Sequence, residues 1–143
     1  MAELGRDSHR IFVFGSNLRG RHGKGAALHA AECYGAIEGV GFGMTGQSYA
    51  IPTKGHQLEV LGLTVIGRYV GYFIRDVRHF DESKPYQFNV TQIGCGLAGY
   101  DPTQIAPMFR PLTLTTGKQY NVWFDEAWKP YLGPAARFWS API

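Results

Sequence analysis

The chain has 143 residues, of which 45% are hydrophobic and 17% are charged. This composition excludes a disordered chain, and the length fits a single domain, residues 1–143, with room for a buried core. No apolar run is long enough for a membrane span or a signal peptide, so we expect a cytoplasmic protein that has no membrane partner.

The first expected elements are a strand and a helix joined by a glycine-containing loop. Residues 10–16 contain Ile-Phe-Val-Phe followed by Gly-Ser-Asn, which is typical of a short buried strand. The alanine-rich residues 24–34 predict a helix, and Gly35 stands where a helix terminator is usual. Between them lies His22-Gly23-Lys24-Gly25-Ala26-Ala27, the first glycine loop. Glycine at such a place lets backbone N–H groups approach a ligand that a Cβ would hold off.

A second strand and a long helix are expected next. Residues 39–46 form a glycine-dense loop, residues 47–51 predict a strand, and Pro52-Thr53-Lys54-Gly55 is expected to break it. From residue 63 to about residue 80, apolar side chains recur at helical spacing. This pattern predicts the longest helix of the chain, weakened by Gly67 and Gly71.

The second half of the chain begins with a strand that leads into another glycine loop. Residues 88–93 predict a third strand, which runs directly into Ile93-Gly94-Cys95-Gly96-Leu97-Ala98-Gly99, the second glycine loop. Asp101 and Pro102 are typical of an N-cap and a first helical position, so a helix is expected through about residue 109. Residues 120–124 predict the last strand, and residues 128–143 form an aromatic-rich tail interrupted by prolines.

Strands separated by helices predict a central, largely parallel sheet that is covered on both faces. In such a sheet ligands bind beyond the carboxyl ends of the strands, where Asn17, Lys54 and the second glycine loop emerge. Two glycine loops at one crevice suggest a clamp for a diphosphate, whereas either loop alone is equally well explained as a tight turn chosen for packing.

Basic side chains gather near the first glycine loop and after the second strand. The net charge of +3 says little by itself, but the positions of the basic residues are informative. The residues concerned are Arg19, Arg21, His22, Lys24, Lys54 and His56. They form either a solvated basic surface or a positively biased cleft for phosphates.

Cysteine and histidine spacing does not predict a metal centre. Cys33 and Cys95 have neither metal-ligand spacing nor a disulfide framework. Cys33 falls in the helical pattern, where a buried apolar role is expected. Cys95 lies in the second glycine loop, where it is either a catalytic thiol or a small residue in a crowded turn. The five histidines form no helical pair suited to zinc, and neither a metal nor another cofactor is expected.

Taken together, these segments resemble the macrodomains, a family that binds ADP-ribose. Asn17 followed by Gly25 and Ala26 at a helix start is similar to macrodomains in general. The blocks Gly23-Lys24-Gly25-Ala26-Ala27, Tyr49-Ala50-Ile51-Pro52-Thr53-Lys54 and Ile93-Gly94-Cys95-Gly96-Leu97 look like those of one subgroup. That subgroup contains the terminal ADP-ribose protein glycohydrolase and an antitoxin that removes ADP-ribose from DNA. The resemblance covers residues 12–109 in the correct order.

The resemblance implies a three-layer α/β/α macrodomain-like fold with a central mixed, largely parallel sheet. It implies that Lys54 is the nucleophile, because the lysine of the subgroup attacks the anomeric carbon of the distal ribose and displaces the modified side chain or base. A lysine amine attacks only in its neutral form, which desolvation or neighbouring cations favour. It also implies that Asn17 orients the distal ribose. The diphosphate would be held by the backbone of Gly23, Lys24, Gly25 and Ala26 and of Gly94, Cys95, Gly96, Leu97 and Ala98.

Two positions differ from the family pattern. Ala98 stands where the glycohydrolases carry an aspartate, which the antitoxin branch does without. Macrodomains also have an earlier strand whose acidic residue holds the adenine amino group, and here only residues 1–9 precede the first strand. Tyr100, Phe124 and Trp128 are each candidates either for stacking on a base or for the core.

Three functions therefore remain open. The first is an ADP-ribosyl glycohydrolase that acts on modified protein or nucleic acid. The second is a non-catalytic binder of ADP-ribose or of a related nucleotide signal. The third is a nucleic-acid-binding module whose basic loops grip phosphates, which is disfavoured because no regular basic stripe alternates with aromatic residues. A compact stand-alone domain of this kind suits a bacterial or phage protein.

Overall fold

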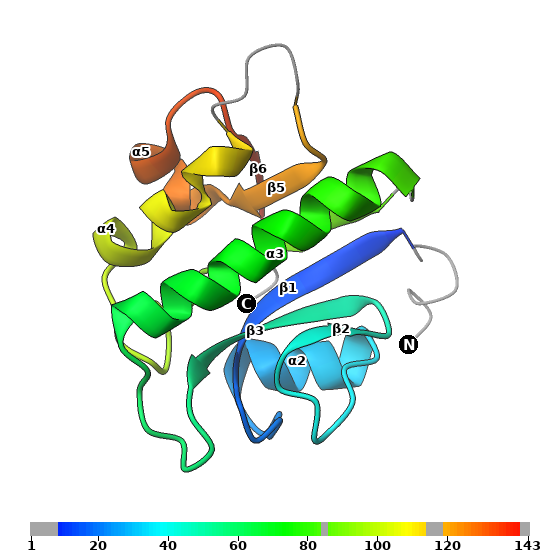
Figure 1. Cartoon of the computed structure of the whole chain (residues 1–143), viewed down its shortest axis with the longest axis vertical. Coiled ribbons are helices and arrows are strands. Elements are labelled where there is room, and N and C mark those ends of the chain that lie inside the picture. The colour runs from blue at the N-terminus through cyan, green and yellow to red at the C-terminus, as the bar shows by residue number, and fades with distance from the viewer. Residues whose placement is uncertain (1–8, 84–85, 114–118, 141–143) are drawn as a thin grey trace.

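A six-stranded mixed sheet forms the centre of the structure, a computed structural model that describes residues 9–83, 86–113 and 119–140. The strand order is β2-β3-β1-β4-β5-β6. Figure 1 labels all of these strands except β4. The strands are β1 (Arg10–Asn17), β2 (Gly43–Thr45), β3 (Ser48–Lys54), β4 (Gln87–Val90), β5 (Val122–Asp125) and β6 (Arg137–Trp139). Every neighbouring pair is parallel except β2 and β3.

The central strand β1 is buried on both faces. Ile11 and Val13 belong to the larger apolar core on one face, and Phe12 and Phe14 belong to a smaller core on the other. A continuous apolar run is typical of a parallel strand with both faces covered. If polar residues alternated with apolar ones in such a strand, the polar side chains would lie in the core on one of the two faces. The run of residues 11–14 therefore explains why β1 occupies the middle of the sheet.

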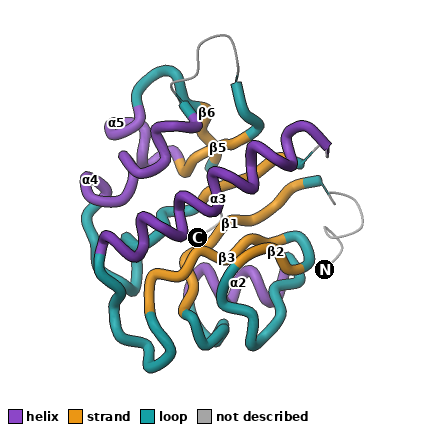
Figure 2. The backbone as a smooth tube through the Cα atoms, viewed as in Figure 1, coloured by secondary structure: helices purple, strands orange, loops and turns teal. Residues whose placement is uncertain are grey.

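Helices pack on both faces of this sheet. The helix α2 (Gly25–Cys33) places Ala27 and Ala30 against the smaller core. The long helix α3 (Leu63–Ser83) contributes Ile66, Val70 and Phe73 to the larger core. In the view of Figure 2, α3 crosses in front of the sheet and α2 lies behind it. Both helices were predicted, and α3 ends at Ser83 rather than near residue 80.

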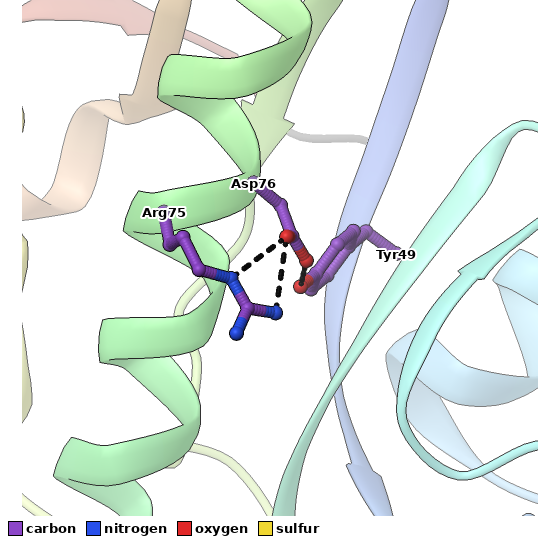
Figure 3. A network of polar contacts seen from close by, with 3 residues as sticks. All are labelled: Tyr49, Arg75 and Asp76. Atoms are coloured by element: carbon purple, nitrogen blue, oxygen red, sulfur yellow. Dashed lines mark hydrogen bonds and ion pairs between the residues drawn. The ribbon is translucent and has the colours of Figure 1, made fainter.

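A buried hydroxyl ties α3 to the sheet (Figure 3). Tyr49 on β3 donates its hydroxyl hydrogen bond to Asp76 on α3, and Arg75 forms an ion pair with the same carboxylate at 3.2 Å. Tyr49 is 1% exposed, so the hydroxyl needs this partner. Burial, and then the hydrogen bond to Asp76, raise the pKa of Tyr49 far above its ordinary value.

The predicted helix at Asp101 and Pro102 exists, but it is shorter than expected. Asp101 caps α4 (Pro102–Ile105) by accepting from the Thr103 N–H at 2.9 Å. A 3₁₀ segment, η1 (Ala106–Leu112), replaces the rest of the predicted helix. Pro107 lacks the N–H that a continuing α-helix requires, and its ring crowds the preceding turn.

Three expectations about strands were wrong. Pro52 does not break the second strand, because β2 pairs with β3 only as far as Ala50 and a proline is accepted where a strand has an open side. The loop of residues 39–46 contains β2, and the tail of residues 128–143 contains β6 after the short helices η2 (Glu126–Trp128) and α5 (Lys129–Leu132). Strands of three residues are too short to carry a periodic signal.

The parallel register brings the carboxyl ends of β1, β3 and β4 to one edge of the sheet. Asn17 pairs with Lys54, and Val13 pairs with Val90. In the described part of the chain, no helix is long and apolar enough to cross a membrane.

Candidate functional site

A cavity of about 760 Å³ lies at the carboxyl ends of β1, β3 and β4. All residues that the sequence predicts to bind a ligand or to react line this one cavity: Asn17, Gly23, Lys24, Gly25, Ala26, Lys54, Gly94, Cys95, Gly96, Leu97 and Ala98. Ligands of open α/β sheets bind at this edge. The convergence of three segments that are distant in sequence is therefore confirmed.

The first glycine loop presents the start of α2 to the cavity. Lys24 is the N-cap residue, and its side chain makes no capping hydrogen bond. The backbone N–H groups of Gly25, Ala26 and Ala27 donate to no residue in the described part of the chain. Unpaired N–H groups and the positive end of the helix dipole favour an anion at such a place.

The second glycine loop lies between β4 and α4, as predicted, but β4 ends at Val90 and does not extend to residue 93. Its shape is held by two backbone hydrogen bonds, Cys95 N–H to Gln92 C=O at 3.0 Å and Tyr100 N–H to Gly94 C=O at 2.8 Å. Gly94 has a φ of +75°, which favours glycine. The N–H groups of Gly96, Leu97 and Ala98 donate to no described residue. This loop therefore supplies a second set of free donors.

The two loops face each other across the cavity. A Cβ placed on Gly25 would lie 3.9 Å from Cδ1 of Leu97, so the start of α2 and the second loop come close together. Leu97 is 66% exposed although its side chain is apolar. An anion between the loops would receive donors from both sides and would be partly covered by Leu97.

The backbone before α2 is fastened to residues 37–41. A Cβ on Gly20 would lie 2.3 Å from the carbonyl carbon of Gly39, so the two segments approach more closely than any other residue permits. His22 is 3% exposed, and its Nε2 lies 3.1 Å from the Ile37 carbonyl oxygen. Because a carbonyl only accepts, Nε2 is the donor in this contact. The His22 side chain therefore holds the first glycine loop to Ile37 and does not face a phosphate.

The basic residues separate into two groups. Arg21, Lys24 and Lys54 line the cavity, and no carboxylate side chain is among its described lining residues. Arg19 and His56 are exposed but do not line it. Both alternatives for the basic residues thus hold in part, because one group biases the cavity toward anions and the other is solvated surface.

Lys54 and Asn17 form one wall of the cavity. Lys54 is half-buried at the end of β3, and its carbonyl accepts from the Leu18 N–H at 2.9 Å. The Asn17 amide is fixed by two hydrogen bonds to the backbone of Arg21, at 2.9 Å and 3.0 Å. The Lys54 side chain forms no ion pair with a described residue, so its amine is available to a ligand.

Cys95 lines the cavity as a neutral thiol. Burial raises the pKa of this thiol to about 11, and the nearby charge of Asp101 acts in the same direction. Because the thiolate is the nucleophile, this environment disfavours the catalytic alternative. Cys33 is half-buried in α2 beside His29, at 3.9 Å from Sγ to Nδ1.

The aromatic candidates for base stacking belong to the core. Phe124 and Trp128 are fully buried, and the hydroxyl of Tyr100 donates to the Leu61 carbonyl at 2.6 Å. The acidic residue that macrodomains carry on an earlier strand would fall in residues 1–9, of which only His9 is described.

The sequence reasoning missed polar residues that line the cavity beside the predicted ones. They are Ser16, Thr53, Thr91 and Gln92. Each lies at or just after the carboxyl end of a strand, where ligands of such sheets bind. Thr91 and Gln92 were missed because the predicted third strand ran past them, whereas Ser16 already stood at the end of the predicted first strand.

The fold and the cavity define a mixed α/β protein with a cationic crevice at the carboxyl ends of its parallel strands. In comparisons with models of protein families, with curated proteins and with solved structures, no match was found. Among the described residues, no group of three or more His, Cys, Asp or Glu side chains is placed to hold a metal ion.

Proposed function

We propose that this protein is an ADP-ribosyl glycohydrolase with a three-layer α/β/α macrodomain-like architecture, which removes ADP-ribose from a modified protein or nucleic acid. The observation that carries the proposal is the pair of facing loops, whose free N–H groups line one cavity together with Lys54. A diphosphate carries negative charge and many acceptor oxygens, and it therefore suits two converging sets of backbone donors.

The position of Lys54 supports a catalytic role. The loops that follow β1 and β4 would hold the diphosphate, and Lys54 stands on β3, the neighbour of β1 on the other side. A ribose attached to the diphosphate can extend toward the end of β3, where Asn17 and Lys54 lie side by side in register. In the proposed complex the amine of Lys54 would lie near the anomeric carbon.

The reaction proceeds in two displacement steps at that carbon. In the first, the lone pair of Nζ of Lys54 forms a bond to the anomeric carbon, and the bond to the modified group breaks with its electron pair leaving on that group. The proton lost from Nζ goes to solvent or to the leaving group. In the second, the oxygen of a water molecule forms a bond to the same carbon, the Nζ–C bond breaks with its electron pair returning to Nζ, and a proton from the water goes to Nζ. ADP-ribose then leaves and the amine of Lys54 is restored.

The residues around the cavity favour one kind of leaving group. No carboxylic acid is among the described lining residues, and Ala98 offers none, so the described lining provides no carboxylic acid to protonate a leaving group. A carboxylate leaving group departs as a stable anion without protonation. We therefore propose ester-linked ADP-ribose, as on an aspartate or glutamate side chain, as the preferred substrate.

The same absence favours the second candidate, a non-catalytic ADP-ribose binder. A calorimetric titration with ADP-ribose tests the ligand, and incubation with ADP-ribosylated protein, DNA and RNA tests turnover. We expect micromolar binding and release of ADP-ribose from the protein substrate. Binding without release from any substrate would favour the binder, and Ala98→Asp would then test whether the missing acid is the cause. Lack of binding would contradict both, and salt-dependent binding of unmodified nucleic acid would favour the third function.

A further inference from the structure

The sheet continues past the cavity on the side opposite Lys54. The strand β4 is followed by β5 and β6, and their carboxyl ends lie at the same edge as the cavity. Neighbouring strands lie about 4.8 Å apart, so the axes of β3 and β4 are separated by roughly 10 Å, with β1 between them. If the distal ribose lies at Lys54, the nucleoside at the other end of the diphosphate lies toward β4 and β5.

Gln92 is the exposed polar side chain that lines the cavity just beyond β4. Val90 pairs with Phe124, so the end of β5 places Asp125 beside the residues that follow β4. Nε2 of Gln92 donates to Oδ2 of Asp125 at 3.4 Å.

Asp125 determines which way the Gln92 amide points. Asp125 is 5% exposed, and its other oxygen accepts from the Ala127 N–H at 2.8 Å. Because a carboxylate only accepts, the NH₂ group of Gln92 must face Asp125. The Oε1 acceptor and the second N–H of the amide remain for a ligand.

This arrangement matches adenine. Adenine presents a 6-amino donor next to a ring-nitrogen acceptor, and a glutamine amide pairs with such an edge through two hydrogen bonds. In hypoxanthine the 6-position is a carbonyl, which would face Oε1 of Gln92 and repel it. We propose that Gln92, held in one orientation by Asp125, reads the base of the ligand and selects adenine. This inference rests on the proposed function.

Titration calorimetry with ADP-ribose and with its hypoxanthine analogue tests the proposal. The wild-type protein should bind ADP-ribose at least about tenfold more tightly than the analogue, a difference of about 1.4 kcal/mol. Gln92→Met keeps the length of the side chain without its hydrogen bonds, and the ratio of affinities should fall to near one. Gln57→Met changes an exposed glutamine outside the cavity and should leave the ratio unchanged.

Asp125→Asn tests whether the orientation of the Gln92 amide, and not only its presence, sets the preference for adenine. The amide oxygen that this substitution introduces still accepts from Ala127, so the new NH₂ group faces Gln92 and the Gln92 amide turns over. Oε1 and the NH₂ group of Gln92 then exchange places, and the preference should move toward the hypoxanthine analogue. If Asp125 had only a structural role, this substitution would weaken the binding of both ligands equally.

Each outcome decides the proposal. If the wild type binds ADP-ribose but Gln92→Met keeps the full preference for adenine, or loses affinity for both ligands equally, Gln92 does not read the base and the proposed function stands. If the folded wild type does not bind ADP-ribose, the proposed function fails and this inference fails with it. Should Asp125→Asn fail to fold, Gln92→Met at the protein surface still decides.

Discussion

Asn17 and Lys54 are register partners at the carboxyl ends of the adjacent parallel strands β1 and β3. The register shifts between Ser16 and Asn17, and the Leu18 N–H donates to the Lys54 carbonyl just beyond this irregularity. The Asn17 amide donates to and accepts from the Arg21 backbone, which leaves one N–H and one lone pair for a ligand. An oriented amide thus lies beside an amine at the wall of the cavity.

Asn17→Asp should weaken ADP-ribose binding by about tenfold or more, while it costs the fold only about 1 kcal/mol. The carboxylate cannot donate to the Arg21 carbonyl, and it adds negative charge next to the diphosphate. Because these hydrogen bonds are exposed, water can replace them and the loss of stability stays small. Calorimetric titration and urea unfolding measure the two effects. Binding within twofold of wild type would remove Asn17 from the proposed site.

Gly96→Val should abolish ADP-ribose binding without unfolding the protein. The backbone of Gly96 is not in the left-handed region, and a Cβ there would meet no protein atom within 4 Å. The added side chain therefore costs little in the free protein but occupies space at the cavity. Gly23→Val meets the same two conditions and should behave similarly. Gly25→Val is a poorer test, because the φ of +56° strains any side chain.

Gly71→Val is the matched control for these variants. Gly71 also faces open space, but it lies on α3 and does not line the cavity. Valine is tolerated in a helix at least as well as glycine, so both stability and binding should be retained. Wild-type affinity in Gly96→Val and Gly23→Val together would show that the ligand binds elsewhere.

Cys95 should react slowly with an alkylating reagent near pH 8 and should be dispensable for turnover. Burial raises the pKa of its thiol from 9.0 to about 11, so the thiolate fraction near neutral pH falls by about a hundredfold. The alkylation rate of Cys95, followed by mass spectrometry, should rise steeply only as the pH approaches 11. Cys95→Ala should keep the release of ADP-ribose. If Cys95→Ala lost turnover but still bound ADP-ribose, the thiol of Cys95 would instead be a candidate for the nucleophile.

Tyr49→Phe should destabilise the protein by about 1.5–3 kcal/mol, the range for a hydrogen bond to a charged group. Tyr49 is buried and donates to Asp76, and burial and this bond raise its pKa. The folded protein favours the neutral phenol of Tyr49. This residue therefore stabilises the fold at pH values below the pKa of tyrosine in the unfolded chain, and the stabilisation is lost as the pH rises above that value. The wild type should therefore lose stability above about pH 10, and Tyr49→Phe should lose less. Urea unfolding across this range measures both effects. Tyr72→Phe, at an exposed tyrosine, should change neither.

The sequence predicts the convergence of the glycine loops on one cavity better than it predicts the edges of the sheet. The glycine loops and the end of β1 were predicted because glycine and the apolar run of residues 11–14 carry strong local signals. The edge strands β2 and β6 were missed because their pairing depends on neighbours that are distant in sequence. Pro52 suggested a strand break because the sequence does not show that β2 ends before it.

The details of the site depend on packing that a sequence pattern does not contain. The sequence places His22 in a basic cluster, whereas its contact with Ile37 comes from a segment that returns to the loop only in the fold. The pairing of Gln92 with Asp125 joins residues at the ends of β4 and β5 that are 33 positions apart. Such contacts are set by the strand order, which local periodicity does not determine.

Lys54→Ala should bind ADP-ribose within about tenfold of wild type, about 1.4 kcal/mol, yet release almost none from a modified substrate. The amine must reach the anomeric carbon for the bond to break, whereas affinity comes mainly from the diphosphate donors of the two loops. Lys54→Arg keeps the positive charge but cannot supply a neutral amine, so it should be equally inactive. Lys24→Ala is the matched control, because Lys24 also lines the cavity as a cation and should affect affinity without removing turnover. Titration calorimetry and single-turnover release assays separate these effects. Substantial activity in Lys54→Arg would mean that Lys54 acts as a fixed charge and not as the nucleophile.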